Sequence, residues 1–197
     1  MAQMEKQAHY PKILKSFNSK ITFLIKKGSI GVIPTDTIYG IVGNALNKKA
    51  VDKIYKLRHR NPKKPMIILV GQLFDLKKFS VLLKTKTYNL KPGAWPHKTS
   101  IVFPVSGAKF RYLHRGINSL AFRLPRSNKL RSFLKKTGPL VAPSANVEGK
   151  PPAKTIEEAQ KYFGDKVDFY IDAGRRVSRP SKLIQIKNDK IIKLRKW

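Results

Sequence analysis

The sequence predicts a single domain of the α/β (α+β) class with a mixed β-sheet. Three observations support this prediction. Short apolar, β-branched runs alternate with segments whose apolar residues recur at helical spacing. The chain has 197 residues, which is enough to bury a sizeable core, and 41% of them are apolar. It contains no internal repeat, low-complexity tract or linker, so we expect one domain over residues 1–197.

The first third of the chain is expected to contain two helices and a buried strand. Residues 11–27 carry apolar side chains at helical spacing, and Gly28 is placed to end that helix. Residues 30–33 form a β-branched run that is typical of a strand. Pro34 has no N–H group to donate to a sheet, so the strand should stop there. Residues 48–58 read as the second helix.

The middle of the chain is expected to add three strands. The apolar run 66–70 indicates a buried strand, and residues 72–91 indicate one or two short helices. A strand is expected at 100–105 and a basic loop at 107–117. Apolar and polar residues alternate over 119–125, the period of a half-buried strand.

The remaining elements are expected at 129–136 (helix), 139–143 (buried strand), 155–162 (helix), 167–172 (strand) and 183–194 (hairpin). Thr155 and Glu158 have the spacing of a capping box, which favours a helix start at that point. Asn188 and Asp189 are typical turn residues for the hairpin.

The composition is strongly basic, with 42 Lys and Arg against 11 Asp and Glu and a net charge of +31. Such a field attracts polyanions without specifying a fold. The alternative is a basic proteome or adaptation to salt. Only Asp36 and Asp172 are carboxylates in plausible pocket loops, which disfavours mechanisms that need paired acids.

The same composition limits location and redox chemistry. The chain has no cysteine, so disulfides, thiolate catalysis and zinc–sulfur sites are excluded. No apolar run approaches the roughly 20 residues that span a bilayer, and the first residues do not resemble a secretory signal. We therefore expect a cytoplasmic protein that makes no membrane contact.

The stretch from Ser29 to Gly43 is the first candidate for a ligand site. A buried strand ends at Pro34 and is followed by a loop with two threonines, one aspartate and one tyrosine. Polar loops after apolar strands are where α/β sheets tend to bind ligands. Gly40 and Gly43 would let the backbone pass close to a neighbour. The alternative is an ordinary strand, turn and second strand.

Three further polar segments follow apolar elements, namely residues 58–64, 144–146 and 180–182. Arg123 adds a guanidinium within an apolar strand, although an arginine that simply points to solvent would give the same pattern. The basic run 58–64 could equally be the solvated end of a helix. Together these segments would offer many hydroxyl, N–H and guanidinium donors and hardly any carboxylate. Such a pocket suits a polyanion, either a nucleotide polyphosphate or a nucleic-acid backbone.

Other kinds of site have no signal in the sequence. It contains no GxxxxGK[ST] or GxGxxG phosphate motif, no GxSxG elbow, and no histidine spacing suited to a metal. Catalysis is therefore expected to work by positioning and charge stabilisation, with a divalent ion carried in on phosphates.

Several motifs in order and spacing resemble the YrdC/TsaC family, the threonylcarbamoyl-AMP synthases, over roughly residues 15–196. These motifs are GVIPTDTIYGIVGNA, IYKLRHRNPKKPMIIL, WPHKTSIVFP, SLAFRLP, APSANVEGKPP and RPSKLI. The resemblance implies a twisted mixed sheet flanked by helices, with a basic concave face, in the short single-domain form of the family. It also implies an enzyme that joins L-threonine, bicarbonate and ATP, with Mg²⁺ on the ATP, releases pyrophosphate, and makes threonylcarbamoyl-adenylate. Transfer proteins then use that product to modify adenosine 37 of tRNA.

The resemblance also implies roles for individual residues. The residues implied to bind threonine are Thr37, Arg123 and Ser181. Those implied to bind ATP are Arg60, Lys64, Ser119, Ala145 and Arg195. Those implied to act in catalysis are Arg58, Arg60, Ser144 and Asn146, and no protein side chain is expected to hold a metal.

The chain departs from the family pattern at four places. The usual KxR is Arg58-His59-Arg60, which replaces a lysine by a guanidinium, and the usual WPGPxT lacks a glycine and a proline in residues 95–100. The usual PST is Pro180-Ser181-Lys182, and the usual DGG is Asp172-Ala173-Gly174. Each change affects a local detail, and none removes a whole subsite.

Two other functions remain open at this stage. A non-catalytic module could hold tRNA or another RNA on the same basic face, as the net charge suggests. A carbamoyl transfer like that of YrdC-like domains in larger carbamoyltransferases is the other, although no fused domain is present.

Overall fold

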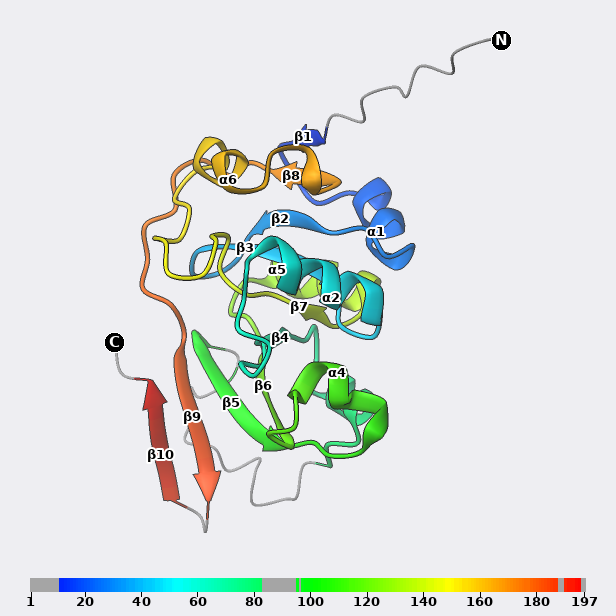
Figure 1. Cartoon of the computed structure of the whole chain (residues 1–197), viewed down its shortest axis with the longest axis vertical. Coiled ribbons are helices and arrows are strands. Elements are labelled where there is room, and N and C mark those ends of the chain that lie inside the picture. Colours follow the sequence, from blue (N-terminus) through cyan, green and yellow to red (C-terminus); the bar gives the residue numbers. More distant parts are fainter. Residues whose placement is uncertain (1–10, 83–94, 96, 188–189, 196–197) are drawn as a thin grey trace.

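Ten strands form one mixed sheet in the computed structural model, which describes residues 11–82, 95, 97–187 and 190–195 (Figure 1). The strand order is β1-β8-β2-β3-β7-β4-β6-β5-β9-β10. The strands are β1 (Lys12–Leu14), β2 (Gly31–Pro34), β3 (Tyr39–Asn44), β4 (Ile68–Leu69), β5 (Thr99–Pro104), β6 (Ser119–Arg123), β7 (Leu140–Val141), β8 (Phe169–Ile171), β9 (Lys182–Lys187) and β10 (Lys190–Arg195). The sheet contains both parallel and antiparallel pairs, which confirms the mixed α/β prediction.

Helices flank this sheet. They are α1 (Ser19–Lys26), α2 (Lys48–Leu57), α4 (Arg111–His114), α5 (Asn128–Thr137) and α6 (Ile156–Phe163), with 3-10 turns η1 (Leu73–Phe79), η2 (Ala108–Phe110) and η3 (Gly164–Lys166). Four of the α-helices start at a side chain that accepts an N–H of the first turn, namely Asn18, Asn47, Ser127 and Thr155. Each such cap contributes about 1 kcal/mol. Among the described residues, no helix has the length and apolar character needed to cross a bilayer.

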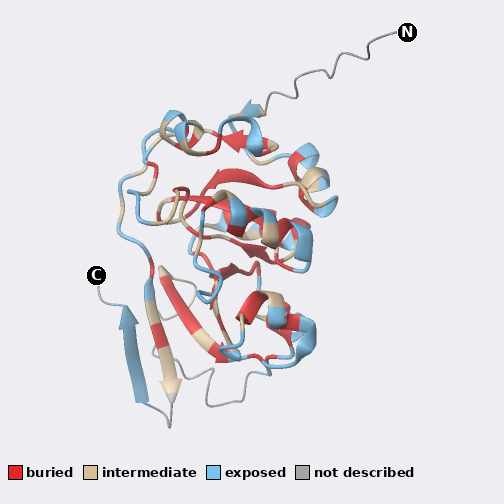
Figure 2. Cartoon of the chain, viewed as in Figure 1, coloured by how far each residue is buried: buried red, intermediate tan, exposed pale blue. Residues whose placement is uncertain are grey.

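The central strands are buried on both faces, as Figure 2 shows. On β2, Val32 belongs to the core cluster that includes Ile54 of α2, whereas Ile33 belongs to the cluster that includes Leu130 of α5. Successive strand residues point to opposite faces, so each face of β2 has its own core. A strand covered on both faces reads as a continuous apolar run, which is why residues 30–33 could be identified.

Most predicted elements are present, with the strand of 66–70 reduced to β4. Strand β2 ends at Pro34, as predicted, and α2 occupies nearly all of 48–58. The turn expected at 188–189 lies outside the described residues, as does much of the helical segment expected at 72–91, of which η1 is described. That all of residues 1–197 form one domain stays a prediction.

Two predictions were wrong. The helix expected over 11–27 begins only at Ser19, because residues 12–14 pair in parallel with β8 as an edge strand. The loop expected at 107–117 instead contains η2 and α4. Helix α4 is only one turn long, and contacts with α2 hold it in place, so no helical periodicity marks it in the sequence.

Strand β3 brings two of the polar loops together. Strands β2 and β3 pair antiparallel as a hairpin. The loop after Pro34 is therefore a turn between two strands, which was the alternative interpretation of this stretch from the sequence. Gly40 pairs with Ser144 in an isolated antiparallel bridge. A Cβ at Gly40 would lie 3.2 Å from the Pro143 carbonyl oxygen, which leaves little room for any side chain. This close approach places the loop of residues 35–38 beside the loop that follows β7.

Candidate active site

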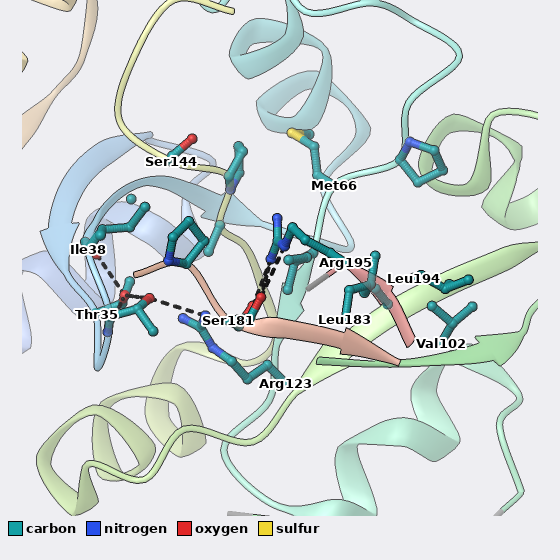
Figure 3. A pocket seen from close by; sticks show the side chains of 18 of the residues that line it. Thr35, Ile38, Met66, Val102, Arg123, Ser144, Ser181, Leu183, Leu194 and Arg195 are labelled. Atoms are coloured by element: carbon teal, nitrogen blue, oxygen red, sulfur yellow. Dashed lines mark hydrogen bonds between the residues drawn. The ribbon is translucent and has the colours of Figure 1, made fainter. Parts of the chain in front are cut away.

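A cavity of about 750 Å³ opens where these loops meet the last hairpin (Figure 3). Its wall combines the loop after β2, the segment after α2, strands β5 and β6, the loop after β7, and the β9–β10 hairpin. Eight of the eleven residues singled out from the sequence line it: Thr37, Arg58, Arg60, Ser119, Arg123, Ser144, Ser181 and Arg195. Lys64, Ala145 and Asn146 lie outside the lining.

The loop after β2 is a tight turn that holds two hydroxyl groups at the cavity. The Thr35 hydroxyl donates to the Ile38 carbonyl at 2.7 Å and lies 3.0 Å from the Thr37 hydroxyl. The Thr37 N–H in turn donates to the Thr35 hydroxyl oxygen at 3.2 Å. Because the Thr35 proton goes to Ile38, the Thr37 hydroxyl donates to Thr35 and is held in a fixed orientation at the cavity.

Arg123 stands behind that hydroxyl and is 4% exposed, so it is not an outward-facing strand residue. Its Nη1 donates to the Thr37 hydroxyl at 3.3 Å, and its Nη2 lies 3.1 Å from Oδ1 of Asp36. This contact is an ion pair without hydrogen-bond geometry at that oxygen, and the Arg123 Nε has no partner. Burial lowers the pKa of Arg123, and the Asp36 charge opposes that shift. The ion pair with Asp36 favours the charged guanidinium, and the buried Nε–H group is unused.

Ser181 and Arg195 close the cavity from the last hairpin. The Ser181 hydroxyl lies 2.9 Å from that of Ser100 on β5, and Arg195 Nη2 donates to it at 3.1 Å. Arg195 also donates from Nε to the Ser181 carbonyl at 3.1 Å. Burial lowers the pKa of Arg195. A serine and a guanidinium from neighbouring strands are thus fixed at one edge of the cavity.

Arg58 holds the loop after β7. Its Nε donates to the Asn146 carbonyl at 2.9 Å, and its Nη2 donates to Asn146 Oδ1 at 3.2 Å and to the Ser144 hydroxyl at 3.3 Å. The Nη1 group is buried without a partner. Burial lowers the pKa of Arg58 to about 10, so the side chain is still cationic at neutral pH. Asn146 lies outside the cavity lining, and its two hydrogen bonds with Arg58 hold that lining residue in position.

The rest of the basic segment is divided between the cavity and its rim. Arg60 donates from Nε to the Lys64 carbonyl at 3.0 Å and from Nη2 to the Pro65 carbonyl at 2.9 Å, which fixes the turn. The Lys64 ammonium instead pairs with Glu148 at 3.0 Å. The Asn61 N–H and then Lys64 hold the pKa of Glu148 below its usual value. Since Arg58 is buried, this segment is more than a solvated helix end.

The two carboxylates singled out from the sequence do not face the cavity. Asp36 pairs with Arg123 from behind, and Asp172 pairs with Lys15 at 2.5 Å. Among the described residues that line the cavity, none is acidic. The phenol of Tyr39 accepts the Ala173 N–H at 2.9 Å and donates to the Gly174 carbonyl at 2.8 Å, so it anchors the segment that leads to β9. Burial raises the pKa of Tyr39.

Sequence reasoning missed two parts of the site. Arg176 donates from Nη2 to the Thr35 carbonyl at 2.6 Å and braces the threonine loop from outside. An apolar wall faces the polar end of the cavity and includes Val102, Leu183 and Leu194 (Figure 3). A basic run marks Arg176 in the sequence, but nothing local marks the apolar wall. The cavity thus offers cations and hydroxyls at one end and apolar surface at the other, which suits an anionic ligand with an apolar part.

Comparisons with known proteins agree with this geometry. The Sua5, YciO and YrdC family model, described as "Telomere recombination", matches residues 23–196. A protein of Methanocaldococcus jannaschii is 34% identical over 177 residues, which are 87% of this chain and 81% of that protein. The threonylcarbamoyl-AMP synthase of Idiomarina loihiensis is 28% identical over 174 residues, 86% of this chain and 92% of its own.

Solved structures give the same picture. Pyrococcus abyssi Sua5 complexed with L-threonine superposes with a TM-score of 0.83 at 25% identity, over 93% of this chain and 56% of that chain. The chain therefore spans about half the length of the Pyrococcus protein. Escherichia coli YciO superposes with a TM-score of 0.78 at 18% identity, over 94% and 93% of the two chains, which supports the fold.

Proposed function

Because this chain belongs to the Sua5/YciO/YrdC family, we propose that it is a threonylcarbamoyl-AMP synthase. The substrates would be L-threonine, bicarbonate and ATP, and the products threonylcarbamoyl-adenylate, pyrophosphate and water. The observation that carries the proposal is the convergence of Thr37, Arg123 and Ser181 on one cavity with Arg58 and Arg60. A family member of the same fold binds L-threonine, and the cationic wall suits a triphosphate beside it.

The threonine end of the cavity would be its most enclosed part. The Arg123 guanidinium lines the cavity and is fixed by Asp36 and Thr37, so it is prepared to bind a carboxylate. The hydroxyls of Thr37 and Ser181 would bind the remaining polar groups of the amino acid. Preorganisation of this kind reduces the entropy lost on binding.

The nucleotide would lie against the arginines and the loop after β7. Arg58 lines this space together with Arg60, Ser119, Ser144 and Arg195. Lys64, Ala145 and Asn146 would act from the rim or from behind. Lys64 must leave Glu148 to reach a phosphate, whereas Asn146 positions Arg58.

Catalysis would depend on electrostatic stabilisation and on the alignment of the reactants. The amine of threonine attacks the carbon of bicarbonate, water leaves, and an oxygen of the resulting carbamate attacks the α-phosphorus of ATP. The bond from that phosphorus to the pyrophosphate oxygen then breaks. All three reactants carry carboxylate, bicarbonate or phosphate charges that repel one another, so a cationic cavity that aligns them lowers the barrier without a protein nucleophile.

We further propose that Mg²⁺ enters with ATP and is held by its phosphates. The described lining contains hydroxyl and guanidinium groups and no carboxylate, a donor set that suits phosphate better than a magnesium ion. The ion would neutralise charge on the leaving pyrophosphate. Use of the product by tRNA-modifying proteins, and a cytoplasmic location, stay predictions from the sequence.

A direct assay tests the proposal. The chain is incubated with ATP, Mg²⁺, bicarbonate and threonine, and pyrophosphate and threonylcarbamoyl-adenylate are measured. We expect both products, and we expect Arg60→Ala to abolish turnover. No product under conditions where a control synthase works would contradict the proposal, and product formation would exclude a purely RNA-binding module.

A further inference from the structure

We infer that Gln185 selects the base of the nucleotide: its side-chain amide pairs with the edge of adenine at the apolar end of the candidate active site. The inference deepens the proposed function and rests on it, since it takes the nucleotide to be ATP. Gln185 lies on β9 and lines the cavity, although no sequence motif singled it out. It is a specificity-determining residue and takes no part in bond formation.

One face of three neighbouring strands forms the floor of this part of the cavity. Strands β6, β5 and β9 lie side by side (Figure 1), and alternate residues of each line the cavity. On β9 these are Leu183 and Gln185, whereas Ile184 between them is 7% exposed and belongs to the core. Because successive strand residues point to opposite faces, the Gln185 side chain points toward the cavity.

The register of the strands sets the neighbours of Gln185. It pairs with Val102 of β5, which pairs in turn with Ala121 of β6. On its other side it pairs with Ile192 of β10, so apolar residues flank the amide on both sides. Gln185 is half-buried, and its side chain makes no hydrogen bond with any other residue that the structure describes. The donor and the acceptor of the amide are therefore both available to a ligand in the cavity.

A flat ring with a polar edge fits this combination. Val102, Leu183 and Leu194 supply apolar surface for the face of such a ring. Figure 3 shows all three on the opposite side of the view from Thr35. A glutamine amide offers a donor and an acceptor side by side, which match a ring nitrogen and the neighbouring 6-amino group of adenine. A phosphate group would use neither the apolar surface nor the acceptor of the amide.

The spacing along the floor agrees with a nucleotide that extends from this amide toward the threonine end. Arg123 lies two residues beyond Ala121 on β6, and Gln185 lies two strands away from Ala121 in the same row. Strands are about 4.8 Å apart and two residues along a strand span about 6.7 Å, so the Cα atoms of Arg123 and Gln185 are about 12 Å apart. An amino acid alone cannot reach both positions, whereas an amino acid followed by the phosphate, ribose and base of a nucleotide can.

Removal of one hydrogen-bonding group from each partner tests the inference. Purine riboside triphosphate is ATP without the 6-amino group, and it keeps the ring nitrogens. Gln185→Leu removes the amide and keeps a side chain of similar size. Dissociation constants of both nucleotides are measured by calorimetry without threonine or bicarbonate, so that no turnover occurs. Gln160→Leu, on α6 and outside the cavity lining, is the matched control.

We expect wild type to bind ATP about tenfold more tightly than purine riboside triphosphate, which is the discrimination typical of a bidentate contact with a base edge. Gln185→Leu should bind the two nucleotides within about twofold of each other, because the 6-amino group has lost its partner. Gln160→Leu should keep the wild-type ratio. Equal binding of the two nucleotides by wild type, or an unchanged ratio in Gln185→Leu, would overturn the inference.

A second variant keeps the test decisive if leucine disturbs strand β9. In Gln185→Glu the carboxylate still accepts a hydrogen bond from the 6-amino group, while its charge weakens the binding of both triphosphates alike. ATP should therefore bind at least about threefold more tightly than the analogue, although both bind more weakly than to wild type. Loss of that preference in Gln185→Glu would overturn the contact with the 6-amino group.

The failure of this inference and the failure of the proposed function are distinguishable. Adenylate formation by a chain whose nucleotide preference does not depend on Gln185 would leave the synthase in place and overturn only the base contact. A wild-type chain that makes no adenylate, but loses its preference for ATP in Gln185→Leu, would refute the proposed function and support the base contact. Absence of ATP binding to the wild-type chain would overturn both.

Discussion

Arg123 and Asp36 form an ion pair with both side chains only 5% exposed, and their nearest charged atoms are 3.1 Å apart. Arg123 faces the cavity, whereas Asp36 lies behind it and also accepts the Arg126 N–H at 3.2 Å. The aspartate thus balances the buried cation without placing a negative charge on the cavity wall. A negatively charged ligand can then approach a guanidinium that is already held in position.

Asp36→Asn should therefore destabilise the fold. The amide keeps the size of the side chain but removes its charge, and a buried cation left without its partner costs about 3 kcal/mol. Urea unfolding monitored by circular dichroism measures the change. Asp165→Asn alters an exposed aspartate and should change stability by less than about 0.5 kcal/mol. Similar losses in the two variants would show that the pair does not stabilise the protein.

Arg123→Lys should weaken the use of threonine selectively. Lysine keeps the charge, so Asp36 retains a partner, but the planar fork that can bind a carboxylate with two hydrogen bonds is lost. We expect the KM for threonine to rise by about tenfold or more and the KM for ATP to change by less than about twofold. Steady-state kinetics with each substrate varied in turn measure both values. A parallel rise in both would contradict a specific carboxylate contact.

Arg58→Lys should lower both stability and turnover, although lysine is the usual residue in the family pattern that this chain resembles. Arg58 makes three hydrogen bonds to Asn146 and Ser144 from two of its nitrogens, and a single ammonium cannot reproduce that geometry. We expect a loss of about 2 kcal/mol in unfolding free energy and a lower kcat. Lys56→Arg, at an exposed position two residues earlier on α2, is the matched control. Unchanged stability in Arg58→Lys would show that the loop is held by other contacts.

Glu148 should contribute to the acid sensitivity of the fold. Its pKa is held below the ordinary value by the Asn61 N–H and by Lys64. A carboxyl with a lowered folded-state pKa stabilises the protein above its unfolded pKa of about 4.3, and that contribution is lost as pH falls through the folded-state value. Glu148→Gln should therefore show a smaller loss of stability between pH 6 and 3 than wild type, measured as the urea midpoint at each pH. An identical pH profile would exclude this contribution.

Much of the site could be predicted because its residue types are unusual where they stand. The threonines after Pro34, the arginine within the apolar strand β6 and the loop of residues 144–146 are polar groups at the ends or in the middle of apolar runs. Gly40 also signalled a close backbone approach, which the structure shows against Pro143.

The features that escaped prediction depend on partners far away in the sequence. Residues 12–14 form a strand only because β8, more than 150 residues later, lies alongside them. Helix α4 has one turn, and Arg115 joins it to Asp52 of α2. The local spacing of apolar residues does not report such distant contacts. The sequence pattern therefore favoured a longer helix over 11–27 and a loop over 107–117.

The hairpin of β9 and β10 gives the cavity a property that concerns its biosynthesis. Ser181 and Arg195 complete a cavity whose first part, at Thr37, is made more than 140 residues earlier. During translation the threonine loop emerges from the ribosome long before its counterpart does. The nascent chain consequently has no complete binding chamber until strand β10 has been released and has paired with β9, so small-molecule ligands can stabilise the finished fold but cannot guide its early steps.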